Sequence, residues 1–255
     1  MRCFVDPDAW GAEPIVLQPD ESHYLLDVRR ARPGEAVELC DGRGRIASAT
    51  IQEVARGRVV VLPGPPRTHP RLCPAVTLVQ ALPKAQKMDW IVQKGTELGV
   101  ACIVPVSTQQ AVVHLNPERA GKKVDRWTTV ARNATRQCGA AWVPEVEPVR
   151  RISEWLDEAR RPEWTFFGDL GPGAGPLDQV LEPLRAAPPP ALAFIIGPEG
   201  DFSPEEREAL LAAGIQPVHF GPGTLRTETA AIYILSICRY LFPAPKYDEN
   251  RYDRT

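Results

Sequence analysis

The strongest constraint on the fold is the regular alternation of apolar runs and amphipathic segments between residues 75 and 242. The amphipathic segments predict helices over 87–100, 118–139, 203–214 and 227–242. The apolar runs predict strands, namely AVTLVQAL (75–82), ACIVPVST (101–108), EWTFFGDL (163–170), ALAFIIG (191–197) and PVHFG (217–221). Alternation of this kind indicates an α/β fold with a mostly parallel sheet covered by helices.

The first 62 residues or so follow a different pattern. Residues 36–63 hold three apolar runs, separated by the turn sequences Asp41-Gly42-Arg43-Gly44 and Arg56-Gly57. Closely spaced strands with glycine turns predict a small β-barrel, and residues 22–35 predict a short helix before it. The proline-rich segment 63–74 is the predicted connector. We therefore predict domains over 1–69 and 70–245, followed by a polar, frayed tail over 246–255.

Charge, hydropathy and cysteine usage limit the classes of function that the sequence can have. The formal net charge is −2, so a nucleic-acid ligand would have to bind a local basic patch. No stretch approaches the roughly 18 apolar residues of a membrane span, and the first ten residues lack the apolar run of a signal peptide. We expect a cytoplasmic protein. Histidines and cysteines show no metal-ligand spacing, and the six scattered cysteines are typical of buried small side chains, so we expect no metal.

The loop FIIGPEGDFSPEE, residues 194–206, follows a predicted buried strand and carries very little side chain. Loops at the carboxyl ends of strands bind ligands in open α/β sheets. Gly197 and Gly200 permit close approach to the backbone. Residues 203–206 form a capping box, with Ser203 as the N-cap and Glu206 at N3. A tight strand-to-helix turn without a ligand is the simpler interpretation of this loop taken alone.

A second loop, FGPGTLRTETA (220–230), also follows a strand and precedes a helix. We predict that Thr227 caps this helix, which places Arg226 and Glu228 near its N-terminus. Helix capping with a surface ion pair explains the same residues equally well. Two glycine-bearing loops after two strands of one sheet favour a shared pocket. Neither loop is a GxGxxG or P-loop sequence, so the standard nucleotide fingerprints do not apply.

Several motifs occur together in an order that resembles the RsmE-type family of 16S ribosomal RNA (uracil-N3) methyltransferases, of the SPOUT or α/β-knot class. The two loop motifs, IIGPEGDFSPEE and LRTETAAI, are the most specific. The others are MRCF, SHYLLDVRRARPGEAVELCDGRG, KMDWIVQKGTELGV and RQCGAAWVPEV. The resemblance covers nearly the whole chain.

The resemblance implies a PUA-like β-barrel domain that precedes a SPOUT methyltransferase domain with a C-terminal trefoil knot, a rare topology. It also implies a homodimer and S-adenosylmethionine (SAM) as the cofactor, bound largely by loop backbone. Carried over by motif, the cofactor-binding positions are Leu82, Gly197, Gly200, Phe220, Gly221, Leu225 and Thr227.

The resemblance further implies N3-methylation of a uridine in 16S ribosomal RNA, with the RNA present in the small subunit. Uracil N3 must lose its proton around the time of attack, so catalysis needs positioning and stabilisation of negative charge. We predict that Arg226 stabilises that charge or grips phosphate, and that Glu228 orients Arg226 or relays a proton. The predicted RNA-binding residues are Arg29, Arg30, Arg43, Arg45, Lys84, Lys94, Arg132 and Arg136.

The sequence departs from the family pattern at the substrate side. Where the family usually has Glu-Arg this chain has Gln109-Gln110, and where it has Glu-Gln-x-x-Arg the chain reads Arg136-Gln137-Cys138-Gly139-Ala140. Phe220-Gly221-Pro222-Gly223 replaces Leu-Gly-x-Arg, and Gly200-Asp201 replaces Gly-Gly. Each missing arginine, at Gln110, Ala140 and Gly223, removes a charge and a bidentate donor. Two alternatives stay open: methylation of another RNA nucleotide, and a non-catalytic RNA-binding or ribosome-assembly protein that retains the knot.

Overall fold

The computed structural model describes residues 1–55, 57–110, 116–158 and 161–243, so the predicted tail over 246–255 lies outside the described residues. The chain divides into two compact units. The first unit comprises Met1–Arg71 with Arg132–Val143, and the second comprises Leu72–Ala131 with the chain from Pro144 onward. The first unit therefore takes in residues 132–143, which the sequence-based division placed in the second domain.

The first unit is built on a six-stranded sheet in the order β1-β3-β4-β5-β2, with β6 paired to β4. Its buried core brings together Leu25, Leu39, Ile51, Val59 and Val61. The strands are β1 (Arg2–Phe4), β2 (Ile15–Val16), β3 (Ala36–Cys40), β4 (Arg45–Ala55), β5 (Arg58–Pro63) and β6 (Arg67–Thr68). The three predicted strands are found as β3, β4 and β5. Within the described residues no ladder joins the end strands β1 and β2, so closure into a barrel stays a prediction.

Two sequence-based expectations for the first unit need correction. The predicted short helix is two helical segments, α1 (Pro19–His23) and a π-helical stretch, η2 (Tyr24–Val28). The predicted connector 63–74 contains a short strand that was not predicted, because Arg67–Thr68 forms β6 and pairs with Arg45 and Ile46 of β4. Two paired residues are too few to give an apolar alternation that the sequence could show.

The second unit is built on an eight-stranded sheet in the order β10-β8-β7-β13-β11-β14-β12, with β9 also paired to β8. Every pairing recorded for this sheet is parallel, as the alternation predicted. The strands are β7 (Ala75–Ala81), β8 (Cys102–Ser107), β9 (Glu145–Val146), β10 (Arg150–Arg151), β11 (Trp164–Gly168), β12 (Gly175–Pro176), β13 (Ala191–Ile196) and β14 (Gln216–His219).

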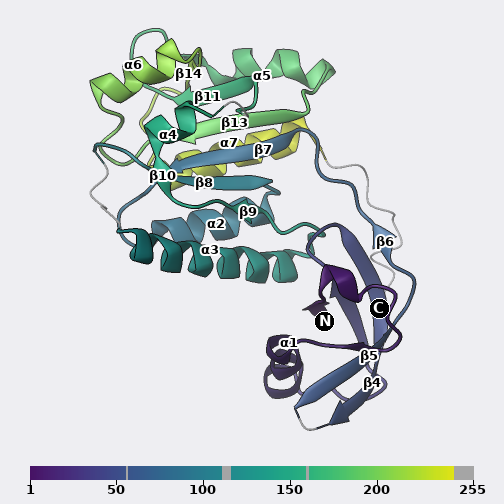
Figure 1. The fold of residues 1–255 in the computed structure, drawn as a ribbon. Coiled ribbons are helices and arrows are strands. Elements are labelled where there is room, and N and C mark those ends of the chain that lie inside the picture. The colour runs from purple at the N-terminus through teal and green to yellow at the C-terminus, as the bar shows by residue number, and fades with distance from the viewer. Residues whose placement is uncertain (56, 111–115, 159–160, 244–255) are drawn as a thin grey trace. The chain divides into compact units, whose positions relative to one another are not determined.

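Helices cover this sheet, as Figure 1 shows. They are α2 (Lys87–Glu97), α3 (Pro117–Cys138), α4 (Ile152–Leu156), α5 (Leu177–Ala186), α6 (Pro204–Ala212) and α7 (Thr227–Leu241). On one face Trp155 of α4 and Leu210 of α6 pack in a core with Val79, Val104 and Ile195. Helices α2 and α7 contact each other, and α7 contacts β7 and β13. Thr227, the first residue of α7, bonds to the carbonyl of Gly197, so the N-terminus of α7 lies next to the loop after β13.

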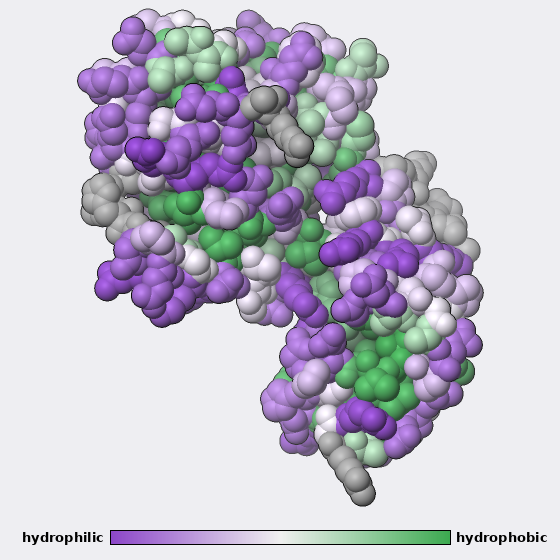
Figure 2. All heavy atoms as spheres, in the orientation of Figure 1, coloured by the Kyte–Doolittle hydropathy of each residue, from purple (hydrophilic) through white to green (hydrophobic). Residues whose placement is uncertain are grey.

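Hydrophilic residues make up most of the surface visible in Figure 2, and hydrophobic residues show in smaller groups. In the part of the chain that the structure describes, no helix has both the length and the apolar character needed to cross a membrane.

Candidate active site

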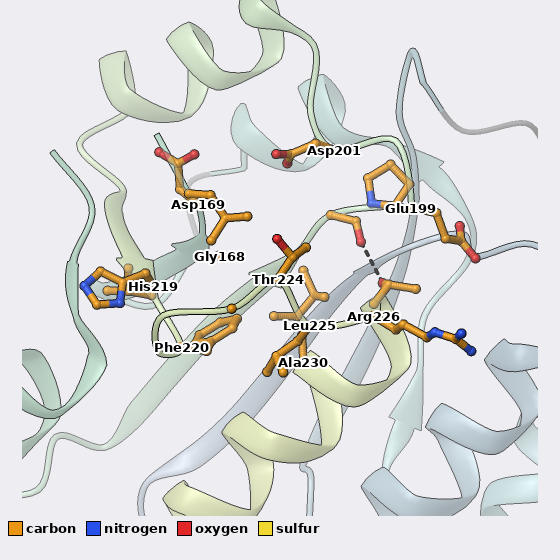
Figure 3. A pocket seen from close by; sticks show the side chains of 17 residues that line it. Gly168, Asp169, Glu199, Asp201, His219, Phe220, Thr224, Leu225, Arg226 and Ala230 are labelled. Carbon is orange, nitrogen blue, oxygen red and sulfur yellow. Dashed lines mark hydrogen bonds between the residues drawn. The ribbon is translucent and has the colours of Figure 1, made fainter. Parts of the chain in front are cut away.

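A cavity of about 270 Å³ opens at the carboxyl ends of β11, β13 and β14. These strands are neighbours in the sheet, so the loops that follow them meet at one edge. The two loops singled out in the sequence therefore share one pocket, as predicted. Its wall is formed by Gly168, Asp169, Leu170, Ile196, Gly197, Pro198, Glu199, Asp201, Val218, His219, Phe220, Gly223, Thr224, Leu225, Arg226, Thr227 and Ala230 (Figure 3).

A hydrogen-bonded chain joins three elements behind this cavity. Gln80 Nε2, in β7, donates to Thr227 Oγ1 at 2.8 Å. Thr227 Oγ1 in turn donates to the Gly197 carbonyl at 2.6 Å, the contact drawn as a dashed line in Figure 3. Gln80 is fully buried and Thr227 is 5% exposed. Buried polar groups need partners, so this chain fixes the loop after β13 against the first residue of α7.

Thr227 does not cap α7, contrary to the sequence-based expectation. The N-cap residue is Arg226, which makes no side-chain capping bond, and Thr227 is the first helical residue. The Thr227 hydroxyl is directed to Gly197 instead. By contrast, the predicted capping box of α6 is present: Ser203 Oγ accepts from Glu206 N at 3.2 Å, and Glu206 Oε2 accepts from Ser203 N at 3.0 Å.

At two glycines in the wall, an aromatic ring fills the place that a side chain would occupy. A Cβ at Gly168 would lie 2.9 Å from the Phe220 ring, a distance that real Cβ atoms do not show. A Cβ at Gly197 would lie 3.2 Å from the Phe202 ring. The absence of a side chain at these two positions therefore lets the Phe220 and Phe202 rings pack against the backbone at the ends of β11 and β13.

The residue that replaces a family glycine in the first loop sits in a left-handed conformation. Asp201 has φ +63°, and its Oδ1 accepts a hydrogen bond from Phe202 N at 2.8 Å. Aspartate is one of the few side chains that adopt this region readily. The departure from Gly-Gly at this position therefore preserves the turn.

Charged side chains gather at one end of the cavity, where Glu199 and Arg226 extend to the same side in Figure 3. Lys87 Nζ lies 2.9 Å from Glu199 Oε1 and 3.1 Å from Glu228 Oε2. The carboxylates of Glu199 and then Glu228, both beside its ammonium group, raise the pKa of Lys87. Burial alone would raise the pKa of Glu199, but the hydrogen bonds from Lys87 and from the Lys84 backbone hold that pKa below its usual value.

Asp169 and His219 lie toward the other end of the cavity. Asp169 is 8% exposed, and Arg207 Nε donates to its Oδ2 at 2.9 Å. Asp169 Oδ1 accepts from Gly171 N at 3.0 Å. His219 Nδ1 accepts from Gly221 N at 3.4 Å. This end therefore presents a carboxylate and an imidazole on an otherwise apolar and backbone wall.

Most of the residues predicted at the site meet at the cavity. Gly197, Phe220, Leu225, Arg226 and Thr227 line it. The remaining predicted positions are adjacent to that wall or buried behind it, namely Leu82, Gly200, Gly221 and Glu228. These placements leave their roles as predictions.

The positions outside the wall have other neighbours. A Cβ at Gly200 would face Gln110 Oε1 at 3.2 Å rather than the cavity. Leu82 is buried, and its backbone N–H bonds to Val106. Gly221 has φ +122°, which favours glycine. Glu228 faces Lys87.

Sequence reasoning missed Gln80, Asp169, Glu199 and His219 as site residues. Glu199 stands inside the Gly-Pro-Glu-Gly motif, and Gln80 is a polar residue within the apolar run 78–82, so both carried a signal. Asp169 and His219 follow or end their strands without any distinctive local pattern. Only the sheet order shows that they meet.

The predicted RNA-binding residues fall into two groups. Arg29, Arg30, Arg43 and Lys84 are exposed. The other four bind acidic side chains within their own unit: Arg45 with Asp41, Lys94 with Glu97, and both Arg132 and Arg136 with the buried Glu21. An arginine that is ion-paired with a carboxylate of its own unit is less available to bind an RNA phosphate.

The positions of the missing family arginines also have defined surroundings. Gly223 lines the cavity. Gln110 lies against Gly200. The Ala140 carbonyl accepts a hydrogen bond from Arg2, whose guanidinium also pairs with Glu38. Only Gly223 is thus part of the cavity wall itself.

Two family models match the chain. The RNA methyltransferase domain matches residues 71–239, and the RNA methyltransferase PUA domain matches residues 17–63. The first match covers the whole cavity wall and the second covers β3 to β5.

Curated relatives and solved structures agree with these matches. The chain is 32% identical to ribosomal RNA small subunit methyltransferase E of Mycobacterium tuberculosis, over 92% of this chain and 89% of the relative. It is 30% identical to the Bacillus subtilis protein of the same name, over 87% and 88%.

Two of the similar solved structures contain SAM. One is a putative methyltransferase of Legionella pneumophila in complex with SAM, with a TM-score of 0.82, 30% identity, and coverage of 94% of this chain and 96% of that chain. The other is the Neisseria gonorrhoeae ribosomal RNA small subunit methyltransferase E bound to SAM, with a TM-score of 0.83, 29% identity, and coverage of 94% and 97%. The chain belongs to the family of ribosomal RNA small subunit methyltransferases E, the RsmE family.

Proposed function

We propose that this chain transfers the methyl group of SAM to N3 of a uridine in 16S ribosomal RNA. The observation that carries the proposal is the cavity at the carboxyl ends of β11, β13 and β14, whose wall contains Arg226. Its loops are the two that hold the most specific family motifs. Family membership supports the reaction class, and the cavity supports the place where it occurs.

The residues present fit SAM. Ile196, Val218, Leu225 and Ala230 supply an apolar wall suited to the adenine of SAM, and the backbone of Gly168 and Gly197 lines the same cavity. Asp169 is buried beside this wall and can accept hydrogen bonds from hydroxyl or ammonium groups. When bound, SAM supplies a methyl carbon that is already electrophilic, so no covalent enzyme intermediate is needed.

The protein's residues position the target base and stabilise the negative charge that forms on it. Uracil N3 becomes a nucleophile when its N–H proton leaves, and negative charge then spreads over the base. Arg226 is exposed at the cavity wall and can stabilise that charge. A carboxylate at the same end receives or relays the proton; Glu199 lines the cavity and Glu228 follows Arg226 by two residues.

Finer features belong to the same proposal. The first unit binds RNA through its exposed arginines, including Arg29, Arg30 and Arg43, and the RNA is presented in the assembled small subunit. The chain acts in the cytoplasm as a homodimer. Its methyltransferase domain, over 70–245, is knotted at the C-terminal end, and the preceding domain, over 1–69, is a PUA-like barrel.

A second candidate is methylation of another RNA nucleotide by the same site. Gly223 lies in the cavity wall where the family usually has arginine, so the wall lacks a bidentate donor at that place. This observation bears on which nucleotide the site accepts.

The test uses purified protein, labelled SAM, and small ribosomal subunits from cells that lack the protein. Mass spectrometry of the digested RNA then locates the label. We expect methyl on N3 of one uridine. Label on another nucleotide would select the second candidate. Tight SAM binding without transfer to any nucleotide would favour the non-catalytic RNA-binding role.

A further inference from the structure

One ammonium group joins two loops at the charged end of the cavity. Lys87 Nζ lies 2.9 Å from Glu199 Oε1 and 3.1 Å from Glu228 Oε2. The three residues come from the first turn of α2, from the loop after β13 and from the first turn of α7. Their side chains are 29%, 23% and 17% exposed, so solvent screens these contacts only in part.

The backbone before α2 supports this arrangement. Lys84 N lies 3.2 Å and 3.3 Å from the two Glu199 carboxylate oxygens and donates to them. Ala85 has φ +56°, an uncommon conformation for a residue with a side chain. The turn that it makes brings the Lys84 N–H and the Lys87 ammonium to the same carboxylate. Strain at such a position is often associated with a functional site.

Of the two carboxylates that Lys87 contacts, Glu228 depends on it more. Glu228 Oε2 is buried and makes no hydrogen bond, so the ion pair with Lys87 is the contact that offsets its loss of water. Without Lys87, Glu199 and Glu228 would be two carboxylates facing each other with no cation between them. Like charges at close range repel and move apart or take up a proton.

We propose that Lys87 is a positioning residue of the methyl-transfer site, which holds Glu199 and Glu228 in place around the cavity end that receives the target base. Lys87 does not line the cavity, so it acts through these carboxylates and through the α7 N-terminus that carries Arg226. The inference rests on the proposed function and deepens it, because it names the group that organises the proton-accepting end of the site.

The experiment compares Lys87→Met with Lys87→Arg, which keeps the charge. Lys122→Met is the matched control, because Lys122 pairs with Glu118 on the surface of α3 and both side chains are 74% exposed. We expect Lys87→Met to slow single-turnover methyl transfer about tenfold or more, equivalent to at least about 1.4 kcal/mol in the barrier. SAM affinity should change by less than about threefold. Lys87→Arg should restore most of the rate.

A second readout does not depend on activity. Carbon-detected NMR titration of the glutamate carboxyls, assigned with Glu199→Gln and Glu228→Gln, follows the ionisation of Glu199 directly. Removal of the adjacent cation should raise the pKa of Glu199 in Lys87→Met and leave it unchanged in Lys122→Met. Adding Glu228→Gln to Lys87→Met should reverse part of this shift, because one of the two facing charges is then absent. If Lys87→Met alone folds poorly, the Glu199 titration can be measured in this double variant, in which the two carboxylates no longer repel each other.

The outcomes separate this inference from the proposed function. If the wild-type protein methylates N3 and Lys87→Met matches it in rate and in Glu199 titration, the positioning role is wrong and the function stands. If the wild-type protein methylates no nucleotide, the proposed function fails. The titration alone then decides whether Lys87 organises the two carboxylates.

Discussion

Thr227 Oγ1 donates a 2.6 Å hydrogen bond to the Gly197 carbonyl, so the first residue of α7 is tied to the loop after β13. Gln80 extends the link to β7, through its 2.8 Å bond to the same hydroxyl. Three segments far apart in the sequence thus share one buried polar contact at the base of the cavity. The shape of the cavity depends on that contact because both loops contribute to its wall.

Thr227→Val keeps the shape of the side chain and removes the hydroxyl. Gln80 Nε2 then loses one acceptor in a fully buried place, which costs about 1–3 kcal/mol of stability. We expect SAM affinity to fall about tenfold, since the Gly197 loop is released. Calorimetric titration with SAM and thermal unfolding measure the two effects, and Thr227→Ser should retain both properties. If Thr227→Val binds SAM as tightly as the wild type, this hydrogen bond is not needed to shape the pocket.

Gly168→Ala tests the close packing of the Phe220 ring against the backbone at the end of β11. The new Cβ would lie 2.9 Å from the Phe220 ring, so the ring must move into or away from the cavity. We expect SAM affinity to drop about tenfold or more. Gly121→Ala is the matched control, because a Cβ there meets no atom within 4 Å, and in the α3 helix it should stabilise by about 0.5–1 kcal/mol. Equal SAM binding by both variants would mean that SAM does not contact this part of the wall.

Arg226→Ala separates binding from chemistry. Arg226 lies at the cavity wall but is exposed, so its loss should leave SAM affinity near normal. Methyl transfer to small subunits should fall at least about tenfold, or about 1.4 kcal/mol of barrier. Arg226→Lys, which keeps the charge but not the bidentate fork, should recover only part of the rate. Full turnover by Arg226→Ala would exclude this side chain from the mechanism.

Asp41 makes the stability of the first unit depend on pH. Burial alone would raise its pKa, but hydrogen bonds from Arg43, Arg45 and Trp10 outweigh burial and hold the pKa below its usual value. A lowered folded-state pKa gives stability that is complete above the unfolded value of about 3.9 and is lost as the pH falls through the folded value. The protection factors of the amides in β3 and β4, which correct for the pH dependence of intrinsic exchange, should therefore fall below about pH 4.

Asp41→Asn is the check on that pH dependence. The asparagine side chain does not titrate, so the part of the pH dependence of protection in β3 and β4 that comes from Asp41 should be absent. Amide exchange in these strands should be faster than in the wild type at neutral pH, because the charge-assisted bonds to Arg45 are weakened by about 2 kcal/mol. An unchanged acid dependence in Asp41→Asn would assign the effect to other carboxylates.

The sequence predicted the parts of the fold that have long apolar patterns. β7, β8, β11, β13 and β14, together with α2, α3, α6 and α7, appear where the alternation placed them, within a few residues at their ends. The shorter elements gave too few residues for a period to show, as with β9, β10, β12 and α4. Helix α5 has apolar residues at 177, 181 and 184, but Pro183 within it and the prolines around it obscure the helical pattern.

The site was predicted in part for a comparable reason. Gly197, Arg226 and Thr227 stand in motifs that resemble those of the family, and this resemblance marked them as candidate site residues. Asp169 and His219 reach the cavity only because β11 lies between β13 and β14 in the sheet, an order that no local pattern encodes. The Lys87 contacts with Glu199 and Glu228 likewise depend on three separate elements. Motif reasoning also placed Thr227 as a helix cap, whereas its hydroxyl binds the Gly197 carbonyl.

The most direct test of the central claim is hydrogen–deuterium exchange of the full chain with and without SAM. If SAM binds in this cavity, amides in the three loops that form it, at 168–170, 197–203 and 219–228, should exchange more slowly with SAM, and those of β3 to β5 should not change. Protection confined to other segments, at SAM concentrations that saturate the protein, would contradict the assignment of the cavity as the cofactor site.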